Sequence, residues 1–216
     1  IPPDHPEVLL HSKAIQDFND SLLARSNMSW NSILGNTSEL DFSEADIEEA
    51  KSIIREQFTL QATFFISDPR ICLLLKVWVE VCRRLDVDLK ILRLVRSPNS
   101  VADSIERHFE MSRDKAVALW VKYNLQLEKS TKALDCTTIG YDAFLQSNGA
   151  AVFHFLKSIK PDFRPSDDPT MGALVGIDDP SSNKDTFRIK VGGRDHDLAE
   201  MYYESIESDL INEARY

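Results

Sequence analysis

Apolar residues follow two different spacings along this chain of 216 residues, and the two spacings alternate. Short apolar runs at 62–66, 89–95 and 136–139 carry many β-branched or aromatic residues and predict strands. Between them, apolar residues recur every three or four positions, which predicts helices. The predicted helices span residues 12–25, 43–58, 71–85, 98–110, 112–134, 148–159 and 198–211.

This alternation is typical of strand–helix–strand units, so we predict an α/β fold. The three strands should be neighbours in one mostly parallel sheet, with helices on both faces in three layers. Residues 1–160 are predicted to form this α/β domain. Residues 161–216 are predicted to be an acidic loop and helix that pack on the same domain, with a short strand at 186–191.

Charged side chains follow two of the predicted strands, at the ends where ligands bind in parallel sheets. Asp68 and Arg70 come after the first strand, and Arg96 comes after the second. Ser104 lies eight residues beyond Arg96, in the helix that begins near Pro98, so both side chains can converge on one anion. Asp68 and Arg70 are either an ion pair that fixes the strand–helix corner or groups of an acceptor site.

The net charge of −10 argues against a broad nucleic-acid surface but not against a small anion. Residues 161–216 hold 13 acidic and 6 basic residues, which indicates a solvated acidic region or an acidic partner surface or lid. No apolar run approaches the roughly 20 residues of a membrane span, and no secretion signal opens the chain.

The three cysteines are odd in number, lie in or beside apolar segments and lack metal-ligand spacing. We therefore expect reduced thiols in a cytoplasmic protein that binds no metal. A phosphate-cradling loop is also missing from the first part of the chain, because such a loop needs glycines between a strand and a helix. Only Gly35 precedes Gly140.

Five short motifs follow one another along the chain. They are Asn19-Asp20-x-Leu22-Leu23, Asp68-Pro69-Arg70-x-Cys72-Leu73-Leu74, Val95-Arg96-x-Pro98-x-x-Val101-Ala102-x-Ser104, Ala118-Leu119-Trp120-x-x-Tyr123-Asn124 and Tyr141-Asp142-x-Phe144-Leu145. In this order and spacing they resemble the bacterial sulfotransferase family, and the resemblance runs from about residue 4 to residue 160. Members of that family have a P-loop-like α/β fold and use 3′-phosphoadenosine-5′-phosphosulfate (PAPS).

The resemblance implies transfer of a sulfuryl group from PAPS to a hydroxyl acceptor, such as a glycan or small alcohol. Arg96 and Ser104 match the residues that hold the 3′-phosphate of PAPS. Tyr141 matches a tyrosine near the adenine, although a core aromatic is an equal alternative. His11 stands where the family has a glutamate, a candidate general base. Imidazole is a competent base near neutral pH, but a lone histidine is more often structural.

Two departures from the family leave other functions open. Family members carry a strand and a glycine-containing loop upstream of where this sequence begins, and we expect that part to be missing here. The family's lysine before Asp-Pro-Arg is Ser67 in this chain. Both departures favour a non-catalytic relative that serves as an interaction module. Another nucleotide-dependent transferase, such as a glycosyltransferase, is a third possibility. The oligomeric state is left open.

Overall fold

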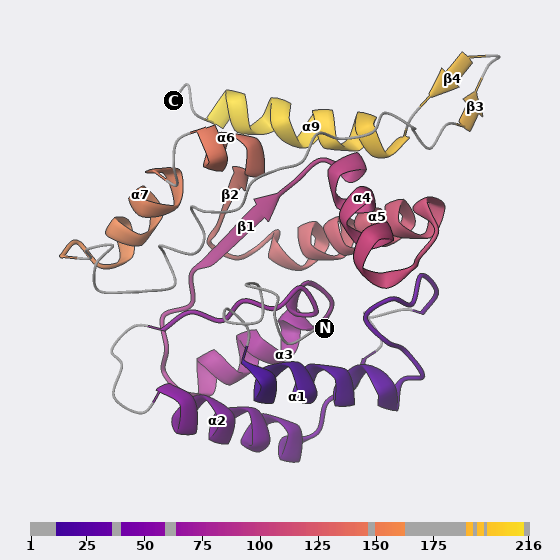
Figure 1. Ribbon diagram of the computed structural model, residues 1–216. Coiled ribbons are helices and arrows are strands. Elements are labelled where there is room, and N and C mark those ends of the chain that lie inside the picture. Colours follow the sequence, from indigo (N-terminus) through magenta and orange to yellow (C-terminus); the bar gives the residue numbers. More distant parts are fainter. Residues whose placement is uncertain are drawn as a thin grey trace. The chain divides into compact units, whose positions relative to one another are not determined.

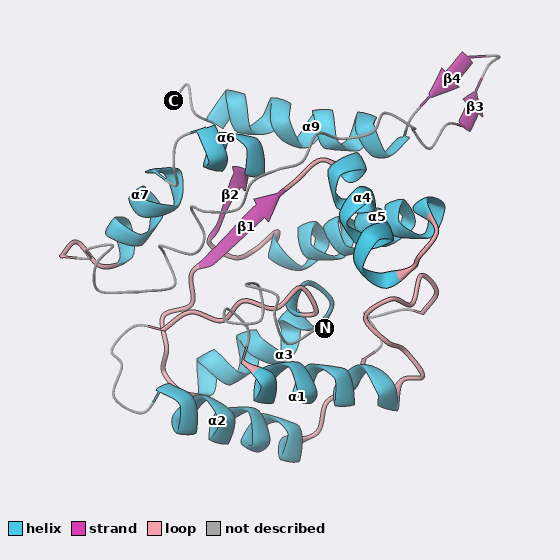
Figure 2. Ribbon diagram, viewed as in Figure 1, coloured by secondary structure: helices cyan, strands magenta, loops and turns pink. Residues whose placement is uncertain are grey.

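A computed structural model describes residues 12–35, 40–58, 64–146, 150–162, 189–191, 194–196 and 198–213. The chain divides into two compact units. Unit 1 comprises Ile1–Leu89 and Tyr123–Leu134, and unit 2 comprises Lys90–Lys122 and Asp135–Tyr216. Figure 1 colours the chain from its first residue to its last, and Figure 2 separates helices from strands.

Among the described residues of unit 1 before Leu89 are the helices α1 (Lys13–Arg25), α2 (Glu44–Phe58) and α3 (Ile71–Arg84), and local chemistry fixes the starts of the first two. Ser12 caps α1, since its hydroxyl accepts a hydrogen bond from the Ile15 amide at 3.2 Å. At α2, the Ser43 hydroxyl accepts from the Asp46 amide at 3.3 Å, and the Asp46 carboxylate accepts from the Ser43 amide at 2.6 Å. These reciprocal bonds form a capping box and fix where α2 begins.

The apolar faces of these three helices form the core of unit 1. Phe18, Trp78 and Val81 are buried there, and the rings of Phe18 and Trp78 meet edge to face with centroids 5.7 Å apart. Phe64 and Ile66 pack against the same core. They belong to the predicted strand at 62–66, and this part of the prediction is wrong: residues 64–66 form no strand, while residues 62–63 lie outside the described residues.

Unit 2 contains two parallel strands, β1 (Ile91–Val95) and β2 (Cys136–Gly140), which confirms two of the predicted strands and their direction. Leu94 pairs with Ile139 and Val95 with Gly140. A separate antiparallel pair joins β3 (Ile189–Val191) and β4 (Arg194–His196). The helices are α4 (Pro98–Phe109), α5 (Arg113–Thr131), α6 (Tyr141–Gln146), α7 (Ala150–Ile159) and α9 (Leu198–Glu213); α5 continues into unit 1 from Tyr123 onward.

Apolar clusters lie on both faces of the β1–β2 pair. Val95 packs with side chains of α4, α5 and α9, including Trp120 and Tyr203. Ile139 packs with Leu92 and with side chains of α6 and α7. Since side chains alternate along a strand, Val95 points to one face and Leu92 to the other. The protein is therefore α/β and mostly helical, with a small parallel sheet that has helices against both faces.

The helix predictions are confirmed within a few residues, apart from α6, which the sequence did not predict. The predicted strand at 186–191 is described only from Ile189 onward, where it forms β3. The predicted boundary between residues 160 and 161 stays a prediction. Among the described residues, no helix is both long enough and apolar enough to cross a membrane.

Candidate functional site

The carboxyl end of β1 leads directly into α4, and hydrogen bonds and a proline fix the backbone of this corner. Arg96 follows Val95, the last residue of β1, and its backbone carbonyl accepts a hydrogen bond from Trp120 Nε1 at 2.9 Å. Ser97 is extended and caps α4, since its hydroxyl accepts from the Ser100 amide at 3.2 Å. Pro98 is buried at the first position of α4, where its fixed φ suits a helix start. The Arg96 side chain therefore begins from a tightly fixed backbone.

The carboxyl end of β2 brings a second predicted residue to Arg96. Tyr141 follows Gly140, and Gly140 is the register partner of Val95. Arg96 and Tyr141 are thus the next residues along two paired parallel strands. The Arg96 guanidinium carbon lies 4.9 Å from the centroid of the Tyr141 ring, within the range of a cation–π contact. The structure therefore brings Arg96 and Tyr141 into contact, two of the residues that the resemblance assigned to nucleotide binding.

Ser104 and His11 complete the predicted site, and the roles of both stay predictions. Ser104 is half-buried on α4, and its carbonyl lies 2.8 Å from His108 Nδ1. Its convergence with Arg96 on one anion stays a prediction. His11 lies outside the described residues, so its predicted role as base is likewise still a prediction.

Asp68 and Arg70 lie in unit 1 and form a structural corner before α3. The Asp68 side chain is only 1% exposed, and its Oδ1 accepts from the Arg70 amide at 2.8 Å and from Arg70 Nη1 at 3.2 Å. Arg70 Nε also donates to Asp20 Oδ1 at 2.6 Å. On the other side, Asn19 Nδ2 donates to Asp68 Oδ2 at 3.3 Å, and Asn19 Oδ1 accepts from Trp78 Nε1 at 3.0 Å.

This network favours the first of the two predicted roles, an ion pair that fixes the corner. Burial by itself lowers the pKa of Arg70, but the hydrogen bond to Asp20 and the charge of Asp68 raise that pKa on balance. The guanidinium therefore remains charged inside the network. Tyr123 lies close by, with its hydroxyl donating to the Trp30 carbonyl at 2.7 Å, and burial raises the pKa of this phenol.

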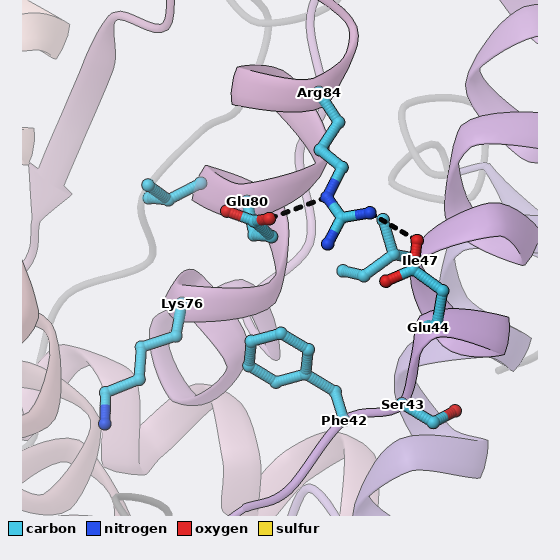
Figure 3. A pocket seen from close by; sticks show the side chains of 8 residues that line it. Phe42, Ser43, Glu44, Ile47, Lys76, Glu80 and Arg84 are labelled. Atoms are coloured by element: carbon cyan, nitrogen blue, oxygen red, sulfur yellow. Dashed lines mark hydrogen bonds and ion pairs between the residues drawn. The ribbon is translucent and has the colours of Figure 1, made fainter.

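A hollow of about 260 Å³ also lies in unit 1, beside the start of α2 and along α3 (Figure 3). Arg84 spans it, since its guanidinium binds Glu80 at 2.7 Å and also binds Glu44. Hydrogen bonds from Arg83 and Arg84 lower the pKa of Glu80 to about 2. The apolar part of the hollow's wall consists of Phe42, Ile47 and Val79. None of the predicted site residues lines this hollow.

The sequence did not reveal that Trp120 contacts Arg96, because the spacing of Trp120 on α5 indicated only a core residue.

Within the described part of the chain, no three histidine, cysteine, aspartate or glutamate side chains are grouped so as to hold a metal ion. The three cysteines are free thiols. Comparison of the chain with protein-family models, with curated proteins and with solved structures gives no match.

Proposed function

We propose that unit 2 binds the 3′-phosphate and adenine of PAPS at the carboxyl ends of β1 and β2, and that the protein is a PAPS-dependent sulfotransferase. One observation carries the proposal: the Arg96 guanidinium lies over the Tyr141 ring at the ends of two paired parallel strands. Ligands of open α/β sheets bind at these ends. The proposal includes the finer fold, in which this sheet is the core of a sulfotransferase-like, three-layer domain.

The geometry of the pair suits a phosphate ligand. A guanidinium stacks on a ring through its face, whereas its N–H donors lie in its plane, so stacking and bidentate phosphate binding are compatible. The first turn of α4 follows Arg96 directly, and its partial positive charge adds to the attraction for an anion. Ser104, two turns further on, would supply a hydroxyl donor, and Tyr141 would contact the adenine.

In the proposed reaction, the acceptor hydroxyl oxygen attacks the sulfur of PAPS. The new oxygen–sulfur bond forms as the bond from sulfur to the bridging phosphate oxygen breaks, and adenosine 3′,5′-bisphosphate leaves. His11 accepts the hydroxyl proton. Positioning and charge stabilisation dominate such group transfers. Asp68 and Arg70 hold each other in unit 1, so we assign them a structural role in this scheme.

Calorimetry with adenosine 3′,5′-bisphosphate, followed by a sulfate-transfer assay with PAPS, tests the proposal. We expect saturable binding of the bisphosphate by this chain. In the complete protein, with the upstream strand and loop of the family, we expect turnover that falls as the pH drops below about 6.5, because protonated imidazole cannot act as the base. His11→Ala should lower turnover by roughly 10²–10⁴ and leave bisphosphate affinity unchanged. Binding without turnover in a protein that includes the upstream strand and loop would identify the non-catalytic interaction module instead. Absence of bisphosphate binding would contradict the nucleotide site itself.

A further inference from the structure

We propose that Trp120 is a positioning residue for Arg96, and that through Trp120 the C-terminal helix α9 supports the anion site. This inference rests on the proposed function, because it concerns the side chain that would bind the 3′-phosphate. In this proposal α9, which lies in the acidic C-terminal part of the chain, stabilises the β1–α4 corner.

The first step is the hydrogen bond from Trp120 Nε1 to the Arg96 carbonyl, at 2.9 Å. Trp120 is only 5% exposed, so water does not replace this donor readily. The carbonyl belongs to the residue whose guanidinium stacks on Tyr141. Fixing this peptide unit fixes the direction in which the Arg96 side chain leaves the strand. A group that binds a ligand must be held closely in place by its neighbours.

The second step is the contact between Trp120 and α9. The Trp120 ring meets the rings of Tyr202 and Tyr203 nearly edge to face, with centroids 5.7 Å and 6.2 Å apart and interplanar angles of 74° and 72°. Such aromatic pairs stabilise beyond the area that they bury. In Figure 1 the arrowheads of β1 and β2 point toward α9. The indole is therefore held between the end of β1 and the aromatic side chains of α9.

The third step is a polar link between the same elements. Asn99, at the start of α4, donates from Nδ2 to Glu200 of α9 at 2.5 Å and accepts from Arg113 of α5 at 2.8 Å. Arg113 also binds Asp103 of α4 at 2.5 Å. The start of α4 is thus tied to α5 and to α9, independently of Trp120. Both sets of contacts converge on the segment that begins with Arg96.

The test compares Trp120→Phe with Tyr123→Phe, a matched control on the same helix. Each variant keeps a ring and deletes a donor to a backbone carbonyl, but the Tyr123 bond to Trp30 lies in unit 1. We expect Trp120→Phe to weaken binding of adenosine 3′,5′-bisphosphate by roughly 3- to 10-fold, the effect of one buried hydrogen bond. Tyr123→Phe should leave this affinity unchanged, although both variants lose stability.

A second readout needs no ligand. The Tyr141 ring should shift the NMR signal of the Arg96 Nε–Hε group upfield, and Tyr141→Leu identifies that shift. Trp120→Phe should reduce the shift, whereas Tyr123→Phe should not. If Trp120→Phe does not fold, Tyr202→Leu removes a ring from the α9 side of Trp120 and should reduce the shift in the same direction.

The outcomes separate the two proposals. This inference is overturned if Trp120→Phe leaves both the affinity and the shift unchanged. The same holds for Tyr202→Leu where that variant replaces Trp120→Phe. Trp120 would then be a packing residue only. If the wild-type protein does not bind the bisphosphate but the shift still depends on Trp120, the proposed function fails and the positioning of Arg96 stands. Reduced affinity together with a reduced shift supports both.

Discussion

At the scale of single residues, a buried polar network surrounds Asp68. Two neighbouring residues of α1, Asn19 and Asp20, bind Asp68 and Arg70, which lie 49 and 50 positions further along the sequence. The sequence suggested an ion pair between Asp68 and Arg70, but it gave no sign of the partners on α1. Charge and spacing indicate a local pair, whereas contacts between distant segments depend on how the helices pack.

We expect Asp68→Ala to lower the free energy of unfolding by about 3 kcal/mol, because Arg70 and Asn19 lose their shared acceptor inside the protein. Urea denaturation followed by circular dichroism measures this change. Asp17→Ala is the matched control, since Asp17 is 59% exposed and should cost less than about 0.5 kcal/mol. A loss of similar size in both variants would contradict the structural role of the network.

At the scale of elements, apolar periodicity made the helices predictable, and a packed loop misled the strand prediction. The helix predicted at 43–58 is α2, which begins at the reciprocal bonds between Ser43 and Asp46. By contrast, the run at 62–66 was predicted as a strand, yet Phe64 and Ile66 are partly buried against the core of unit 1 without strand pairing. Phe64 stacks on Phe58 with ring centroids 4.6 Å apart. A short apolar run cannot distinguish these two cases, since both bury the same residues.

The cap of α4 offers a prediction at this scale. Ser97→Ala should destabilise the protein by about 1 kcal/mol, because the Ser100 amide loses its acceptor at the helix start. Ser100→Ala keeps that amide and should cost clearly less. Thermal unfolding of the two variants, compared with the wild type, measures the difference. Equal melting temperatures for the two variants would show that the Ser97 hydroxyl does not cap α4.

At the scale of the whole molecule, the sequence predicted the α/β class and the parallel pairing of β1 with β2 but not the two compact units. Trp120 and Tyr123 lie three residues apart on α5, and their spacing is typical of one buried helix face. The structure assigns Trp120 to the core of unit 2, and Tyr123 packs against the core of unit 1. Periodicity shows which side chains are buried, but it does not show which core they enter.

The site was predictable to the same extent. Arg96 and Tyr141 were each assigned from a motif beside a strand end, and the parallel register then brings them together. Trp120 was missed because its importance lies in one N–H group rather than in its apolar spacing. The sequence thus identified the residues that carry charge or a ring at the strand ends, whereas the hydrogen bond from Trp120 to the Arg96 carbonyl depends on how α5 packs.

The central claim is that Arg96 binds a 3′-phosphate, and one comparison of affinities tests it most directly. Calorimetry would give the affinity of the wild type, Arg96→Ala and Arg107→Ala for adenosine 3′,5′-bisphosphate and for adenosine 5′-monophosphate. Arg107 is the control, because it is an exposed arginine of α4 whose loss changes the net charge equally. We predict that the wild type and Arg107→Ala prefer the bisphosphate by about 10- to 150-fold, the effect of a charged hydrogen bond of about 1.5–3 kcal/mol. In Arg96→Ala this preference should nearly disappear, with little change for the monophosphate. Equal affinities in the wild type, or an undiminished preference in Arg96→Ala, would contradict the account.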